Sequence, residues 1–127
     1  MLSLPATTKV FLFAKPCDMR KGFDGLFGLI QDKMNLSPMS GYLFVFMNRN
    51  RTLIKILYWD NDGLAIYYKR LEKGTFKRPT AQINAPNSEL SQEELYLILR
   101  GIDFEKTLPA WQAGKKRKRF LSNNFVS

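Results

Sequence analysis

The sequence predicts an α+β fold, and three observations support that prediction. Runs of aromatic and β-branched residues, which are typical of strands, are interspersed with two segments of helical spacing. The connections between the central runs are short and polar, which favours antiparallel hairpins. The chain has 127 residues and 45% apolar composition, so it is one domain in length and can bury a core. We expect a strand, a helix, a three-stranded antiparallel meander and a second helix within residues 1–106, followed by a flexible basic tail over 107–127.

The first strand and the first helix are expected before residue 35. Lys9–Ala14 reads KVFLFA and predicts a strand. A helix is expected over about 19–34, because Asp18 is a suitable N-cap and apolar residues follow it at helical spacing. Glycines recur at every third position of this helix and weaken it, which predicts close packing on the sheet; they are Gly22, Gly25 and Gly28.

Three further runs predict the meander. They are Tyr42–Met47, Leu53–Trp59 and Leu64–Arg70, joined by the turn-rich connectors NRNR at 48–51 and DNDG at 60–63. Tyr42–Met47 is apolar on both faces, so we expect it to be central and covered on both sides. Trp59 is expected to be a core anchor rather than a platform for base stacking.

The second helix carries the clearest boundary signals. Ser91 and Glu94 have the spacing of a capping box, in which the serine is the N-cap and the glutamate is the third helical residue. Gly101 is expected to end the helix.

The composition restricts the possible functions. The chain has no histidine and one cysteine, which argues against a zinc site and excludes an internal disulfide. We find no nucleophile–base pair, so we expect no enzymatic activity, no metal and no cofactor. The longest apolar run is too short to span a bilayer and no signal peptide is evident, so we expect a cytoplasmic protein without membrane contact. The net charge of +9 indicates a polyanionic partner, with nucleic acid the first choice.

The meander should sort these charges between its two ends. Consecutive hairpin turns lie at opposite ends, so one end should hold the acidic turn with Asp60 and Asp62. The other end should gather cations that form a candidate phosphate footprint: Arg49, Arg51, Lys69, Arg70 and Lys73, with Lys77 and Arg78 following. The alternative is that solvated hairpin ends simply collect charge. The tail adds a further basic run, Lys115, Lys116, Arg117, Lys118 and Arg119.

Arg20 and Lys21 raise a separate question. In the expected helix they occupy the first turn, where cations are mildly unfavourable beside the positive end of the helix dipole. A bound phosphate or carboxylate would make this arrangement favourable. The alternative is that the two side chains pair with Asp18 and Asp24.

Several uncommon strings together resemble a known family. They are DMRKGFDGL at 18–26, GYLFVF at 41–46, IKILYWDNDGLAIYYKRLEKGTF at 54–76 and GID at 101–103. In this order they resemble the small accessory protein, often labelled TnpB, of the bacterial insertion-sequence group numbered sixty-six, which is unrelated to the RNA-guided nuclease of the same label. The resemblance covers about residues 4–106 and does not include the chain from Pro109 onward.

The resemblance implies a non-catalytic protein that is encoded beside a separate transposase and is needed for efficient transposition. It implies either DNA binding at the ends of the element or assembly with the transposase. An RNA-binding protein is a third possibility, because the aromatic strings at 10–15 and 41–48 faintly resemble the strand motifs of one RNA-binding fold, although their order along the chain does not fit. The resemblance brings no catalytic residues. The family pattern falls on Asp18, Arg20, Lys21, Gly22, Asp24, Gly25, Lys55, Trp59, Asp60, Gly63, Lys69, Arg70, Leu71, Gly74 and Phe76.

Overall fold

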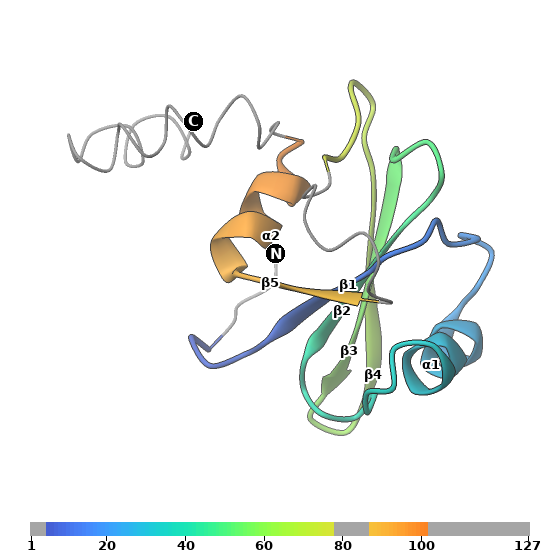
Figure 1. Ribbon diagram of the computed structural model, residues 1–127, viewed down its shortest axis with the longest axis vertical. Helices are drawn as coiled ribbons and strands as arrows, with labels where there is room; N and C mark the ends of the chain where they lie inside the picture. Colours follow the sequence, from blue (N-terminus) through green and yellow to red (C-terminus); the bar gives the residue numbers. More distant parts are fainter. Residues whose placement is uncertain (1–4, 78–86, 102–127) are drawn as a thin grey trace.

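The structure, a computed structural model, describes residues 5–77 and 87–101 and confirms the α+β class. Figure 1 shows the elements along the chain. They are β1 (Val10–Phe13), α1 (Phe23–Asp32), β2 (Leu43–Met47), β3 (Leu53–Asp60), β4 (Gly63–Arg70), β5 (Asn87–Leu90) and α2 (Gln92–Leu99).

The strands form one five-stranded mixed sheet in the order β4-β3-β2-β1-β5. β3 pairs antiparallel with both β2 and β4, and β5 pairs antiparallel with β1. The pairing of β1 with β2 is parallel, and the connection between them carries α1. Two parallel neighbours need such a crossover, since a tight turn can join only antiparallel strands. The expected arrangement was therefore incomplete in two respects, because it left β1 unplaced in the sheet and it missed β5.

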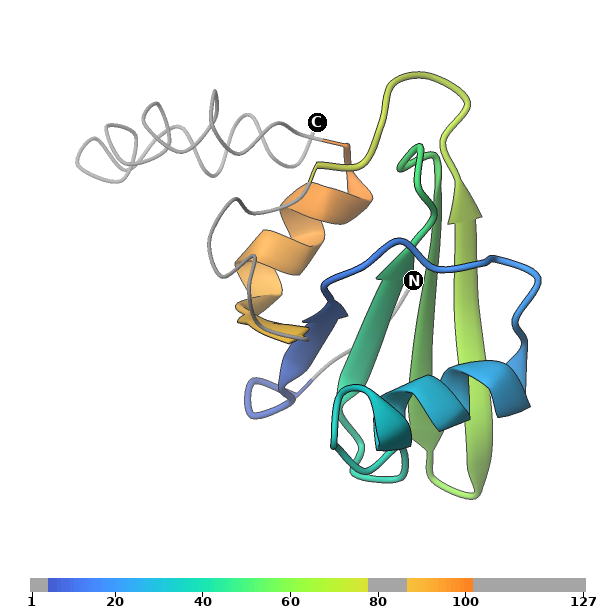
Figure 2. The same ribbon diagram turned by 45° about the vertical axis from the view of Figure 1, so that its right-hand side comes forward.

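Each helix covers one face of the sheet, which gives two apolar clusters (Figure 2). On one face, Leu95 and Ile98 of α2 pack with Val45 of β2 and Ile56 of β3. On the other face, Leu26 and Ile30 of α1 pack with Phe44, Phe46 and Leu57. Every residue of β2 is buried, so the prediction that this strand is central and covered on both sides is confirmed.

α1 begins later than expected. Its N-cap is Gly22, without a side-chain cap, and Asp18 lies four residues upstream. The Asp18 carboxylate accepts a hydrogen bond from the Arg20 backbone N–H at 2.9 Å, and its carbonyl accepts one from the Lys21 N–H at 3.1 Å. Asp18 therefore closes a local turn of its own, which is a common alternative for this residue type.

We expected the glycines at 22, 25 and 28 to allow close packing of the helix on the sheet, and this expectation was wrong. An added Cβ would meet nothing within 4 Å at Gly22 or at Gly28. At Gly25 it would lie 3.0 Å from the Lys21 Cβ, so the crowding comes from the turn that precedes the helix.

α2 follows its prediction closely. The Ser91 hydroxyl accepts a hydrogen bond from the Glu94 N–H at 3.0 Å, and the Glu94 carboxylate accepts one from the Ser91 N–H at 2.8 Å. This reciprocal pair is the expected capping box. The helix ends at its C-cap, Arg100, and is followed by Gly101, whose φ of +70° is one that glycine adopts readily.

Candidate nucleic-acid interface

The strongest candidate site lies at the end of the sheet where β2 leads into β3. The turn between these strands carries Arg49 and Arg51. Because β1 runs parallel to β2, both strands end at this edge, and Lys15 follows β1 there. A backbone hydrogen bond of 2.8 Å from the Cys17 N–H to the Met47 carbonyl joins the two strand ends. We call Lys15, Arg49 and Arg51 the basic edge.

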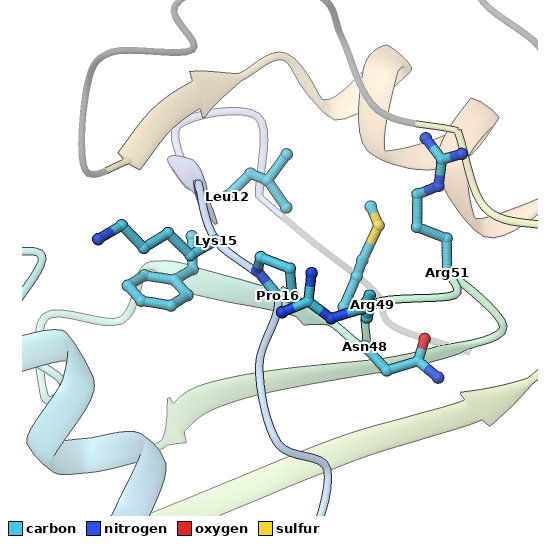
Figure 3. A pocket seen from close by; sticks show the side chains of 8 residues that line it. Leu12, Lys15, Pro16, Asn48, Arg49 and Arg51 are labelled. Atoms are coloured by element: carbon cyan, nitrogen blue, oxygen red, sulfur yellow. The ribbon is translucent and has the colours of Figure 1, made fainter.

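The three residues of the basic edge help to line a pocket of about 130 Å³ (Figure 3). Leu12, Phe13, Pro16 and Met47 provide its apolar lining, and Asn48 joins the three cations in lining the rest. Figure 3 shows Lys15 and Arg51 on opposite sides of this region, with Arg49 between them. Among residues 5–77 and 87–101, none of those that line the pocket carries a carboxylate, so no anionic side chain within this lining offsets the three cations.

Asn48 fixes the turn that carries the two arginines. Its side-chain oxygen accepts hydrogen bonds from the Thr52 and Leu53 N–H groups at 2.9 and 3.0 Å. Its amide also donates to the Thr52 hydroxyl at 3.1 Å. Arg51 adopts φ +59°, which places the turn in a left-handed conformation at this residue. The arginines are thus presented by a turn whose backbone is already ordered.

The segment after β4 packs against the same turn. The Leu71 N–H donates to the Thr52 carbonyl at 2.9 Å, and the Phe76 N–H donates to the Arg51 carbonyl at 2.6 Å. The exposed Lys73 lies within this segment. The register also places Arg70 opposite Leu53, so the end of β4 reaches the edge that the sequence predicted.

Three of the cations predicted for this end of the sheet have partners among the described residues. The Lys69 Nζ donates to the Leu99 carbonyl at 2.7 Å, at the end of α2. Arg70 forms an exposed ion pair of 2.8 Å with Glu72. The Lys77 Nζ donates to the Thr75 hydroxyl at 3.0 Å. Lys69 therefore has a structural contact that competes with a role in binding. Arg78 and the tail cations Lys115, Lys116, Arg117, Lys118 and Arg119 lie outside the described residues.

Arg20 pairs with Asp18, as the local alternative predicted, although not on a helix. Its guanidinium lies 2.7 Å from the Asp18 carboxylate, and both groups are exposed. Hydrogen bonds from the Arg20 side chain and backbone lower the pKa of Asp18 to about 2, and the carboxylate raises the pKa of Arg20. Since Arg20 and Lys21 precede α1, the expectation that they occupy its first turn was wrong.

Lys55 is a buried lysine whose role the sequence did not reveal. It lies in β3 with 8% of its surface exposed. Its Nζ donates to the carbonyls of Met19 and Lys21, at 2.8 Å in each case, and lies 4.6 Å from the centre of the Tyr68 ring. Lys55 therefore ties the turn before α1 to the sheet. The only signal for this in the sequence is a lysine inside an otherwise apolar strand.

Three residues of the family pattern lie at the opposite, acidic end, namely Trp59, Asp60 and Gly63. The turn between β3 and β4 exposes Asp60 and Asp62, and Asp60 pairs with Gly63. Trp59 is only half-buried, so it is not the core anchor that we expected. Asp24 is exposed in the first turn of α1, where a carboxylate is favourable. Within residues 5–77 and 87–101, no group of three or more acidic or cysteine side chains is arranged to hold a metal ion.

None of the helices in the described ranges has the length and apolar character needed to cross a membrane.

Comparison with known proteins identifies the family. The family model described as "IS66 Orf2 like protein" matches residues 8–108. Two proteins of Sinorhizobium fredii (strain NBRC 101917 / NGR234) are similar. "Uncharacterized protein y4hO" is 33% identical over 115 residues, covering 91% of this chain and 98% of that protein. "Uncharacterized protein y4jC" is 30% identical over 98 residues, covering 77% of this chain and 82% of that protein. No solved structure is significantly similar. The matched segment spans both helices and all five strands, and the chain belongs to the IS66 Orf2-like protein family.

Proposed function

We propose that this protein is a non-catalytic accessory factor for the transposition of an IS66-type insertion sequence, and that it binds DNA through its basic edge. The family supports the link to transposition. The observation that carries the DNA-binding part is the basic edge itself, where three cations line one pocket and no described residue of that lining carries a carboxylate.

The chemistry of the edge suits a phosphate backbone. Guanidinium groups form paired, charge-assisted hydrogen bonds with phosphate oxygens. Asn48 already holds the backbone of the turn, so DNA binding would order side chains rather than a loop. The net charge of +9 would add attraction at longer range.

A protein partner is the second candidate, and the apolar lining of the pocket favours it. Leu12, Phe13, Pro16 and Met47 could receive an apolar side chain of the transposase, while acidic residues beside it meet the arginines. The two candidates differ in their response to salt. Release of counterions from DNA makes the logarithm of affinity fall linearly and steeply with the logarithm of salt concentration.

The experiment is fluorescence anisotropy with a duplex from an end of the insertion sequence and with a scrambled duplex. A single strand of the same sequence tests the RNA-binding alternative, because proteins of that type favour unpaired bases. The full chain is compared with a form that ends at Gly114, which removes the basic run at 115–119. The proposal expects the shorter form to retain duplex binding with a preference for the end of the element. Loss of all binding with the tail would contradict it and make the transposase the next ligand to test.

A further inference from the structure

The outer edge of β4 is the longer of the two edges of the sheet. β4 is eight residues long and occupies one end of the strand order, whereas the opposite edge strand, β5, has four residues. Among residues 5–77 and 87–101, β4 pairs with β3 alone. Residues of an antiparallel strand alternate in the direction of their backbone groups, so every second residue of β4 directs its N–H and C=O away from β3.

The same edge displays apolar side chains. Tyr68 of β4 is 52% exposed, and Phe23, the first residue of α1, is 50% exposed. In Figure 2 the first turn of α1 extends past β4, on the face to which Lys55 ties the preceding turn. A strand added beside β4 would therefore lie next to this overhang and cover apolar surface as well as backbone groups.

The distribution of charge along β4 indicates that the added strand is β4 of a second copy of this chain. The strand begins beside the acidic turn with Asp60 and Asp62, and it ends in Lys69 and Arg70. Two copies of β4 side by side in opposite directions bring the basic end of each beside the acidic turn of the other. A parallel arrangement would instead bring like charges together. The edge is thus complementary to itself under a two-fold axis, as the interface of a symmetric dimer must be.

We propose that two copies of this chain associate through antiparallel pairing of their β4 strands, with the two-fold axis at Tyr67. The two-residue turn closes on the Asp60–Gly63 pair, so the even-numbered residues from Leu64 to Arg70 have outward-directed backbone groups. An axis at Tyr67 pairs these residues with one another. Arg70 then lies opposite Leu64 of the second copy and diagonal to its Asp62, which the long side chain reaches by exchanging its exposed pairing with Glu72.

The test is analytical ultracentrifugation of the full chain over a range of concentrations, with charge reversals at the two ends of β4. The wild type is expected to be a dimer that dissociates on dilution. Asp62→Lys and Arg70→Asp should each weaken the dimer by about tenfold, because each reversal acts twice in a symmetric interface. The double variant Asp62→Lys/Arg70→Asp should recover most of this loss.

Asp32→Lys is the matched control for Asp62→Lys, since it makes the same charge change at an exposed position at the end of α1. It should leave the dimer unchanged, and circular dichroism verifies that each variant folds. Hydrogen exchange of β4 amides should slow as the dimer forms. A monomer at every concentration would overturn the proposal, as would a dimer in which both single reversals behave like the control. The readout is independent of DNA, so its failure would leave the proposed function untouched.

Discussion

Lys55 shows how one side chain can explain several residues of the family pattern. Asp18 closes the turn before α1. The Lys55 Nζ holds the same turn against the sheet by donating hydrogen bonds to the carbonyls of Met19 and Lys21. Tyr68 covers the same Nζ with its ring. A buried ammonium without such partners would be strongly unfavourable. The contacts of Lys55 are therefore a structural reason for a basic residue within an apolar strand.

The first prediction concerns the replacement Lys55→Met. Methionine fills similar volume but leaves the carbonyls of Met19 and Lys21 without their donor. We expect the free energy of unfolding to fall by about 1–3 kcal/mol, which is the usual cost of leaving buried polar groups without a hydrogen-bond partner. Water that reaches the two carbonyls would reduce this cost. Urea denaturation measures the change in free energy. Lys33→Met, at an exposed position, should change the free energy by less than about 0.5 kcal/mol. Equal effects of the two replacements would contradict the structural role.

The ion pair between Arg20 and Asp18 gives a second prediction, on pH. The pKa of Asp18 is lowered from 3.8 to about 2, so the folded protein holds this carboxylate in its charged form more strongly than the unfolded chain does. The resulting stabilisation is fully present above pH 3.8 and is lost as the pH falls through about 2. Titration of the Asp18 carboxyl by NMR should show the low midpoint. Arg20→Gln should return it toward 3.8, and an unchanged midpoint would contradict the pairing.

At the scale of elements, local signals predicted α2 better than they predicted α1. The capping box of α2 involves side chains three residues apart, so the sequence alone contains it. The start of α1 depends on whether Asp18 caps a helix or closes a turn. In the structure the turn is stabilised by Lys55, which is distant in the sequence and donates hydrogen bonds to two carbonyls of the turn. Local pattern could not decide between a cap and a turn.

The third prediction tests the cap of α2. Ser91→Ala removes the acceptor for the Glu94 N–H and should lower the free energy of unfolding by about 1 kcal/mol. Ser91→Asp keeps an acceptor at the same position and should restore most of the loss. Thermal or urea denaturation of both variants gives the comparison. An alanine variant as stable as the wild type would show that the box contributes nothing to the fold.

At the scale of the whole molecule, the pairing of β1 and β5 in the sheet could not be predicted from the sequence. β5 has the polar sequence NSEL, so neither apolar alternation nor β-branched residues indicated a strand there. Its partner β1 was recognised as a strand, but its parallel pairing with β2 was not. That pairing brings Lys15 to the same edge as Arg49 and Arg51. Recognition of a strand–helix–strand crossover would have predicted Lys15 as part of the site.

The fold places acidic and basic side chains at opposite ends of the sheet, whereas the composition gives only their net charge. The predicted acidic turn and the basic edge lie at opposite ends of β3, and the expected cations of β4 reach the basic end. Lys69 contacts the Leu99 carbonyl, which leaves Arg49 and Arg51 as the better test of binding. These two arginines lie on an ordered turn, and their replacement leaves the hydrogen bonds of Asn48 in place.

The most direct test of the basic edge is the salt dependence of DNA affinity for Arg49→Gln/Arg51→Gln. The matched control Lys9→Gln/Lys33→Gln removes the same charge; Lys9 precedes β1 and Lys33 follows α1, both at exposed positions. If the arginines contact phosphates, their variant should bind duplex more weakly, and its logarithmic salt slope should be shallower by about two, roughly one for each lost contact. The control should keep the slope of the wild type. Equal slopes in both variants would contradict DNA binding at the basic edge and leave net charge or the tail as the source of affinity.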